Sequence, residues 1–497
     1  MLNIPLHIID AAIFGALAVG VLFALFASGA RKGKRNFSKL AWVIGGAFAV
    51  VLAYQTCWQL GVFGGDRFHA FMRQHNTREG SASFRVQRGK ILDANGEVLA
   101  ERGEARLRRY PLGAAAVHVV GYYDRRFGVT GVERMMNATL RGEETATGNM
   151  AQTLAKKIGN DRVTGGDVWL TLDARLQQFA SEQMAGKTGA IVVMRPDGAL
   201  LALVSAPSYA PEDAATAMRD AEGAPLLNRA VAGLYPPGST FKIVMALGAL
   251  GSGQRFTFEC PAEGFMGIRD NDYYAAQRRG ATWGGRGAIG VGEAFVHSSN
   301  VWFSQLAVAL GQARLETLGE MFRLDERWVY ALDAGREMQT TAGKFPSAKL
   351  RREQAQVGIG QGAMVVTPLH VAMWTSAVAG GGALWQPRLL ATEEPKLLWR
   401  VADASAAREV AGFMREAVSR GTGRNADVPG LRVCGKTGTA QVGGGADHAW
   451  FTCFAPQENP QIVVTVLVER GGFGGAVAAP IARAVLEEAA RLGVVRP

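Results

Sequence analysis

One serine–lysine pair in the chain has the spacing of a helical turn, Ser239-Thr-Phe-Lys242. A serine hydroxyl is a poor nucleophile until a base removes its proton. Residues i and i+3 share a helix face, so Lys242 can lie close to Ser239. A lysine is a base only when its amine is neutral, which requires burial or cationic neighbours that lower its pKa. The pattern predicts covalent catalysis through a serine ester.

Two further groups follow in chain order, Ser298-Ser-Asn300 and Lys436-Thr-Gly438. The hydroxyl of Ser298 can relay a proton, and the amide of Asn300 can hold both a lysine and a substrate. Lys436 could be the cation that lowers the pKa of Lys242.

The residues after Lys436 are expected to form a strand that binds substrate. Thr437 and Thr439 would then point to one side, because side chains alternate along a strand. Gly438 between them would let a substrate backbone approach closely. The backbone N–H groups of Ser239 and Thr439 would form an oxyanion hole.

Each group has a simpler structural interpretation. Ser239 follows Pro236-Pro237-Gly238 and could be a helix N-cap. Ser298 and Asn300 could be polar helix residues, and Lys436 a solvated charge. The occurrence of all three groups in this order favours the catalytic interpretation.

The elements that must position these residues follow from hydrophobic periodicity and turn signals. Strands near both ends with helices between them predict an α/β layer and a helical subdomain. We expect hairpins at 88–100 and 190–205, strands at 167–172, 449–454 and 462–469, and helices at 132–140, 174–184, 239–250, 292–310, 369–378 and 480–492.

Other motifs predict no site. Residues 430–437 match GxxxxGK[ST], but a phosphate-binding loop needs a helix after the threonine, and a glycine-rich segment follows here. Residues 421–426 fit GxGxxA but follow a helix, so we interpret them as a turn. No HExxH pair or CxxC pair is present, and Asp447-His448 has no G-x-S-x-G partner, so neither a metal nor a cofactor is expected.

We interpret the four cysteines as small buried residues: Cys57, Cys260, Cys434 and Cys453. A disulfide bond between Cys434 and Cys453 remains an open alternative.

The charge distribution indicates a membrane anchor. The net charge of +11 divides into +4 over residues 1–63, +5 over 64–170 and +2 over 171–497. Residues 11–30 and 40–63 carry no charge and are long enough to cross a bilayer, with a basic loop at 31–39 between them. By the positive-inside rule the loop is cytoplasmic and the body after residue 63 is outside the cytoplasm. This placement argues against nucleic-acid and nucleotide partners.

The sequence resembles the class B penicillin-binding proteins over nearly all of residues 84–497. Besides the three motifs, the resemblance rests on the segments 88–96, 131–134, 228–229, 235–242, 360–362 with 367–369, 421–423, 436–441 and 448–451.

The resemblance implies a transpeptidase domain of the penicillin-binding and serine β-lactamase-like fold at 171–497, a short β-rich pedestal at 64–170, and the two-span anchor at 1–63. In that domain a central antiparallel sheet is flanked by helices, with a helical subdomain beside it. The family is a serine D,D-transpeptidase that cross-links peptidoglycan stem peptides and is acylated by β-lactams. Its implied catalytic residues here are Ser239, Lys242 and Ser298, with substrate held by Asn300, Lys436, Thr437, Gly438 and Thr439. It also implies a multi-span glycan polymerase of the shape, elongation, division and sporulation (SEDS) group as partner, in the inner membrane.

Three features depart from the family. Relatives usually have one span, and their pedestal is longer than the segment 64–170, so the family's usual partner contacts are not assured here. Ser299 also stands where many relatives have a cysteine that would accompany Cys260. A D,D-carboxypeptidase or serine β-lactamase is the alternative enzyme, but no E-x-x-L-N motif follows Asn300 to supply a deacylating base. A non-enzymatic β-lactam sensor is a further alternative. A sensor would need a cytoplasmic domain to respond to the bound β-lactam, and the expected cytoplasmic loop at 31–39 has only nine residues.

Overall fold

The computed structural model describes residues 45–48, 50–51, 87–103, 107–124, 126–142 and 164–496. The chain separates into two units, Met1–Glu79 and Gly80–Pro497. In the first unit the six described residues are helical, and the expected spans at 11–30 and 40–63 with their loop at 31–39 otherwise lie outside the described residues. No helix among the described residues combines the length and apolar character needed to cross a membrane.

The second unit begins with a small four-stranded sheet in the order β3-β2-β1-β6. The expected hairpin at 88–100 is confirmed, since β1 and β2 pair antiparallel around Gly96, whose φ is 90°. The strand expected at 167–172 is shorter, two residues that pair parallel with β1. The elements of this part are β1 (Ile91–Leu92), β2 (Val98–Arg102), β3 (Arg108–Arg109), η2 (Gly113–Ala115), α5 (Val117–Val120), β4 (Tyr123–Asp124), β5 (Gly128–Val129), α6 (Gly131–Met135), α7 (Asn137–Leu140) and β6 (Val168–Trp169).

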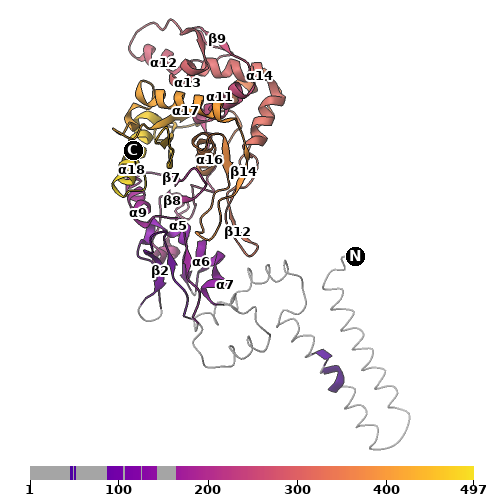
Figure 1. The fold of residues 1–497 in the computed structure, drawn as a ribbon, viewed down its shortest axis with the longest axis vertical. Helices are drawn as coiled ribbons and strands as arrows, with labels where there is room; N and C mark the ends of the chain where they lie inside the picture. The colour runs from indigo at the N-terminus through magenta and orange to yellow at the C-terminus, as the bar shows by residue number, and fades with distance from the viewer. Residues whose placement is uncertain are drawn as a thin grey trace, which may run out of the picture. The chain divides into compact units, whose positions relative to one another are not determined.

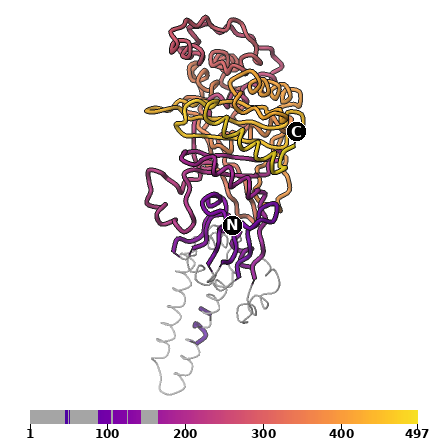
Figure 2. Tube along the Cα trace, turned by 90° about the vertical axis from the view of Figure 1, so that its left-hand side faces the viewer, coloured from indigo at the N-terminus to yellow at the C-terminus, as the bar shows by residue number. Residues whose placement is uncertain are grey.

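A five-stranded antiparallel sheet in the order β15-β16-β17-β7-β8 forms the centre of the remaining chain. Two of its inner strands, β7 and β17, are apolar and rich in β-branched residues, as fully buried strands are. The first and last strands of this sheet along the sequence, β7 and β17, lie side by side. Figure 2 shows the yellow C-terminal strands next to the purple β7 and β8. The strands are β7 (Gly189–Met194), β8 (Leu200–Ala206), β15 (Cys434–Ala440), β16 (His448–Ala455) and β17 (Ile462–Val468).

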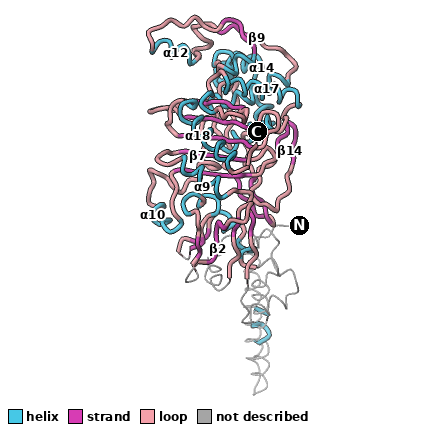
Figure 3. Tube along the Cα trace, turned by 60° about the vertical axis from the view of Figure 1, so that its left-hand side comes forward, coloured by secondary structure: helices cyan, strands magenta, loops and turns pink. Residues whose placement is uncertain are grey.

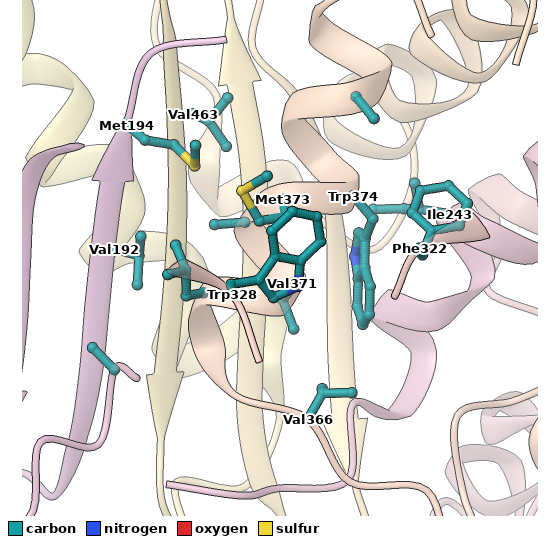
Figure 4. Packing of buried hydrophobic residues seen from close by; sticks show 14 of the residues in the cluster. Val192, Met194, Ile243, Phe322, Trp328, Val366, Val371, Met373, Trp374 and Val463 are labelled. Carbon is teal, nitrogen blue, oxygen red and sulfur yellow. The ribbon is translucent and has the colours of Figure 1, made fainter. Parts of the chain in front are cut away.

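Helices cover both faces of this sheet (Figure 1). Alternate residues face opposite sides, so Ile191 and Val193 pack into a cluster with α9 (Ala174–Gln183) and α18 (Gly474–Arg491). On the other side, Figure 4 shows Met373 and Val371 of α16 (Pro368–Ala379) facing Val192, Met194 and Val463 of the sheet, with Trp374 towards Ile243 and Phe322. The sheet is therefore buried between two helical layers, as the sequence predicted.

A helical subdomain carries the Ser239–Lys242 and Ser298–Asn300 segments. Figure 3 shows α12 and β9 near α14 and α17 at one end of this unit. The other elements are η4 (Pro211–Asp213), α10 (Ala214–Ala217), η5 (Gly238–Phe241), α11 (Lys242–Gly251), β9 (Thr257–Cys260), α12 (Asn271–Arg278), β10 (Gly287–Gly290), α13 (Val291–Val296), α14 (Asn300–Met321), β11 (Val329–Asp333), β12 (Arg336–Gln339), α15 (Arg351–Val357), β13 (Ala383–Trp385), β14 (Leu397–Arg400), α17 (Ala404–Ser419) and η6 (Arg424–Ala426).

Four expected helices were wrong in part. The helix expected at 132–140 is two short helices, α6 and α7, because the backbone of Met136 between them departs from helical geometry, with a ψ of 21°. The helix expected at 292–310 is two helices, α13 and α14, because Ser298 has a φ of 57° that a right-handed helix cannot contain. The helix expected at 480–492 begins at Gly474 and holds Pro480 in its interior, where packing of the buried alanines outweighs the lost hydrogen bond. The helix expected from Ser239 starts with a 3₁₀ turn, η5, before α11.

Candidate active site

Ser239 lies in the 3₁₀ turn η5, where side chains three residues apart share a face, and Lys242 is the residue three positions on. Two other segments of the same chain, around Gly360 and Thr439, contact this turn. The N–H of Gly238 donates to the carbonyl of Gly360 at 2.9 Å, and a Cβ on Gly238 would lie 2.7 Å from the Thr439 oxygen. The turn that carries the hydroxyl is thus packed directly against β15.

Lys242 is completely buried, and its amine donates to neutral oxygens. The three acceptors are the carbonyl of Ser298 at 2.7 Å, the Oδ1 of Asn300 at 2.7 Å and the Oγ of Ser298 at 3.2 Å. The face of the Phe303 ring lies 5.5 Å away. The structure therefore brings Lys242, Ser298 and Asn300 together, as the sequence predicted.

Ser298 occupies the break between α13 and α14. Its left-handed φ of 57° is rare for a serine and costs on the order of 1 kcal/mol. The strained backbone turns both the carbonyl and the hydroxyl of this residue towards Lys242. The same hydroxyl accepts from the Nζ of Lys436 at 2.7 Å, so one serine oxygen bridges two lysines.

Lys436 belongs to β15, the edge strand of the central sheet, and is completely buried. Its amine donates to Ser298 and, at 3.2 Å, to the carbonyl of Thr437. The alternative interpretation of Lys436 as a solvated charge is wrong, because the side chain is buried. The strand continues through residues 434–440, so no helix follows the GxxxxGK[ST] match and the rejection of a phosphate-binding loop is confirmed.

Thr437 and Thr439 are both engaged on their side of the strand. The Thr437 hydroxyl lies 2.7 Å from that of Thr422, and the Thr439 hydroxyl accepts from the N–H of Gly474 at 3.5 Å. Thr422 belongs to the 421–423 turn, whose resemblance to the family was the only sequence signal for it.

Gly438 is required for a different reason than the sequence suggested. A Cβ there would lie 2.8 Å from the Cγ2 of Thr240 and 2.9 Å from the Cβ of Trp450. The space beside Gly438 is thus filled by the nucleophile turn and β16. The glycine lets β15 approach the turn that carries Ser239, and the expected approach of a substrate backbone to Gly438 stays a prediction.

Burial lowers the pKa of both lysines. The pKa of Lys242 falls to about 7, with the charge of Asp270 raising it and that of Arg286 lowering it further. The pKa of Lys436 lies well below its usual range, because of burial and the neighbouring charge of Lys242. A neutral amine on Lys242 is therefore accessible near neutral pH, and it can accept a proton from a hydroxyl.

The sequence missed a second support beneath the nucleophile turn. The Nε1 of Trp450 donates to the carbonyl of Pro236 at 3.1 Å, and the hydroxyl of Tyr235 donates to Glu469 at 2.7 Å. Arg229 also donates to Glu469, at 2.8 Å. Tyr235 and Arg229 carry part of the family resemblance, but a strand-end glutamate has no sequence signal of its own.

The described cysteines form no disulfide bond. Cys260, Cys434 and Cys453 are free and buried, which confirms their interpretation as small buried residues. Cys434 and Cys453 are on adjacent strands but one register position apart, so their side chains face opposite sides of the sheet. Among residues that the structure describes, no three His, Cys, Asp or Glu side chains gather as metal ligands would.

Known protein families match the two parts of the second unit. The family described as penicillin binding protein transpeptidase domain matches residues 178–487, and penicillin binding protein A dimerisation domain matches residues 88–168.

Individual relatives agree with these families. The peptidoglycan D,D-transpeptidase PbpA of Mycolicibacterium smegmatis is 31% identical over 474 residues, covering 87% of this chain and 94% of that protein. The ceftriaxone acyl-enzyme complex of penicillin-binding protein A from M. tuberculosis superposes with a TM-score of 0.71 at 29% identity, covering 82% of this chain and 99% of the other. A structure of Pseudomonas aeruginosa PBP2 gives a TM-score of 0.66 at 32% identity, covering 81% and 96%.

The sheet, the helical subdomain and the serine–lysine site together define a penicillin-binding transpeptidase domain. The chain belongs to the class B penicillin-binding proteins, the peptidoglycan D,D-transpeptidases.

Proposed function

We propose that this chain cross-links peptidoglycan stem peptides through an acyl-enzyme on Ser239. The observation that carries the residue assignment is the chain of hydrogen bonds from Lys242 through the Ser298 hydroxyl to Lys436, directly beside the nucleophile turn. Ser239 Oγ bonds to the carbonyl carbon of the penultimate D-alanine, the peptide C–N bond breaks, and terminal D-alanine leaves with a proton. An amine of a neighbouring peptide then attacks the ester, and Ser239 regains its proton.

The side chains would have different roles in proton transfer. Lys242, with its pKa lowered to about 7, accepts the Ser239 proton. Ser298, held between the two lysines, passes a proton to the leaving amine. Asn300 orients Lys242 through its Oδ1.

Substrate would be held along β15. Thr437 and Thr439 offer hydroxyls there, and the amine of Lys436 would offer an N–H donor towards a terminal carboxylate. Gly438 lets the strand approach the nucleophile turn. The N–H groups of Ser239 and Thr439 would stabilise the oxyanion of the tetrahedral intermediate. A β-lactam would acylate the same serine.

The domain division and membrane attachment extend this proposal. Residues 171–497 would form the transpeptidase domain and 64–170 the pedestal. Residues 1–63 would anchor the chain in the inner membrane through spans at 11–30 and 40–63. The basic loop at 31–39 supports a cytoplasmic loop, and hence an extracytoplasmic catalytic domain. We propose a SEDS-type glycan polymerase as the membrane partner, because cross-linking needs newly polymerised strands.

Labelling with fluorescent penicillin tests the nucleophile. The full-length wild-type protein in detergent and Ser419→Ala, a change at an exposed serine, should both label. Ser239→Ala should not label, and a labelled Ser239→Ala protein would refute the assignment. Intact-protein mass spectrometry then follows the adduct: a persistent penicilloyl-enzyme agrees with a transpeptidase, whereas rapid hydrolysis indicates a β-lactamase.

A further inference from the structure

Asp270 is a buried carboxylate next to the active site, 4% exposed. It stands at the N-cap position of α12 but makes no side-chain hydrogen bond to that helix. Its Oδ1 instead accepts from the backbone N–H of Asn300 at 2.6 Å and of Val301 at 3.1 Å, at the start of α14. The Ser299 hydroxyl donates to the same carboxylate at 3.0 Å. The carboxylate therefore holds the segment that carries Ser298 and Asn300.

The residue before Asp270 fixes the side chain of Asn300. The Nδ2 of Asn300 donates to the carbonyl of Arg269 at 3.1 Å. An amide whose nitrogen is engaged in this way must present its oxygen at the other end, and that oxygen accepts from Lys242 at 2.7 Å. Two adjacent residues thus hold both the backbone and the side chain of Asn300 in register with the lysine.

Charged groups surround this contact on several elements. Arg286, just before β10, lies 3.5 Å from Asp270 and also pairs with Asp272 of α12. The Cys260 thiol at the end of β9 lies 3.9 Å from the Ser299 hydroxyl, and burial raises its pKa to about 11, so it remains neutral. Lys242 on α11 is influenced by the negative charge of Asp270 and the positive charge of Arg286 in opposite directions. Lys436 lies on β15. His297 at the end of α13 belongs to the same set, because burial and the charge of Arg286 lower its pKa.

We propose that Asp270 is a positioning residue for acylation, which holds Asn300 against Lys242 and supplies the negative charge that balances Arg286 beside that lysine. Asp270 does not touch the reacting atoms in this account. The inference rests on the proposed role of Lys242 as the base. It adds a residue that lies 30 positions before Asn300 in the chain.

The test measures the rate constant for acylation by benzylpenicillin, on full-length protein in detergent, from about pH 5 to about pH 9. Asp270→Asn preserves the shape and removes the charge. The rising limb of its pH profile should move to lower pH, by about one unit, because the protonated amine loses its favourable neighbour. Arg286→Gln should move the limb in the opposite direction. Ser299→Ala, the matched control, loosens the same segment without changing charge and should lower the rate while leaving the limb in place.

The outcomes separate this inference from the proposed function. If the wild-type profile has no rising limb, the role of Lys242 as base is refuted, and the inference falls with it. If the limb is present but moves with neither Asp270→Asn nor Arg286→Gln, only the inference is overturned. Should Asp270→Asn fail to fold, the direction of the Arg286→Gln shift decides alone.

Discussion

Two clusters of fully buried charge lie in different parts of the second unit, and they are built in opposite ways. In the first, between residues 88 and 137, Glu133 meets Arg88 and Arg108, each through a 2.6 Å contact to its Nε. In the second, two amines that would repel each other if both were protonated, those of Lys242 and Lys436, donate to neutral oxygens, and the pKa of each is lowered. Paired buried charges hold a fold together once formed, whereas like charges buried side by side are unfavourable. A protein retains the second arrangement where the shifted pKa values have a use.

The first prediction concerns a variant that removes Glu133 from its ion pairs with Arg88 and Arg108. Glu133→Ala would leave two guanidinium groups buried without their carboxylate, and the free energy of unfolding should fall by about 3 to 5 kcal/mol. Equilibrium urea unfolding of the full-length protein measures this. Glu487→Gln, which removes an exposed pair with Arg483, is the control and should change stability by less than about 0.5 kcal/mol. A loss below about 1 kcal/mol for Glu133→Ala would show that the clusters do not differ as described.

The second prediction removes a charge from the like-charged cluster. Lys436→Met should leave the free energy of unfolding unchanged or raise it by up to about 2 kcal/mol, because an apolar side chain replaces a buried amine that is costly to desolvate. Acylation by penicillin should fall by about 10³-fold. The exposed Lys344→Met serves as control in both assays. Marked destabilisation by Lys436→Met would mean that this lysine has a structural role.

The third prediction concerns the pH dependence of stability. The pKa of Lys242 is lower in the folded protein than in the unfolded chain, so between these pKa values the unfolded state binds more protons. Stability contributed through Lys242 therefore increases as pH rises above about 7, by at most about 1.4 kcal/mol per pH unit. Urea unfolding of wild type and Lys242→Met at several pH values isolates this dependence. An identical pH slope for the two proteins would contradict a lowered pKa.

The fourth prediction concerns the strained backbone between the lysines. Ser298→Ala and Ser298→Gly both remove the bridging hydroxyl and should lose acylation to a similar degree. The glycine variant should be more stable than the alanine variant by about 0.5 to 1 kcal/mol, because glycine accepts a φ of 57° without a steric penalty. Thermal unfolding of the two variants compares them directly. Equal stability would indicate that the left-handed conformation stores no strain.

The sequence predicted the site well because its residue types and their chain order are demanding. Few protein classes other than serine acyltransferases have residues of these types in the order Ser239, Lys242, Ser298 and Lys436. The structure brings the last three into hydrogen-bond contact. The central sheet was predictable for a related reason, since buried strands such as β17 are continuous β-branched runs.

The parts that the sequence could not predict depend on tertiary contacts. The segment around Ser298 has helical periodicity, and its break is imposed by the hydrogen bonds to Asp270 and Lys242. Pro480 normally marks a helix start, but burial of the surrounding alanines carries α18 through it. Asp270 lies in a short charged segment with Arg269 and Asp272, and only its folded position distinguishes it from them.

The central claim is that a buried, neutral lysine activates Ser239, and the pH dependence of wild-type acylation tests it most directly. The rate constant for acylation by benzylpenicillin should rise about tenfold per pH unit below the pKa of Lys242 and level off above it. The levelling should occur at a pH of about 7. A rate constant that does not change between about pH 5 and about pH 9 would contradict the account.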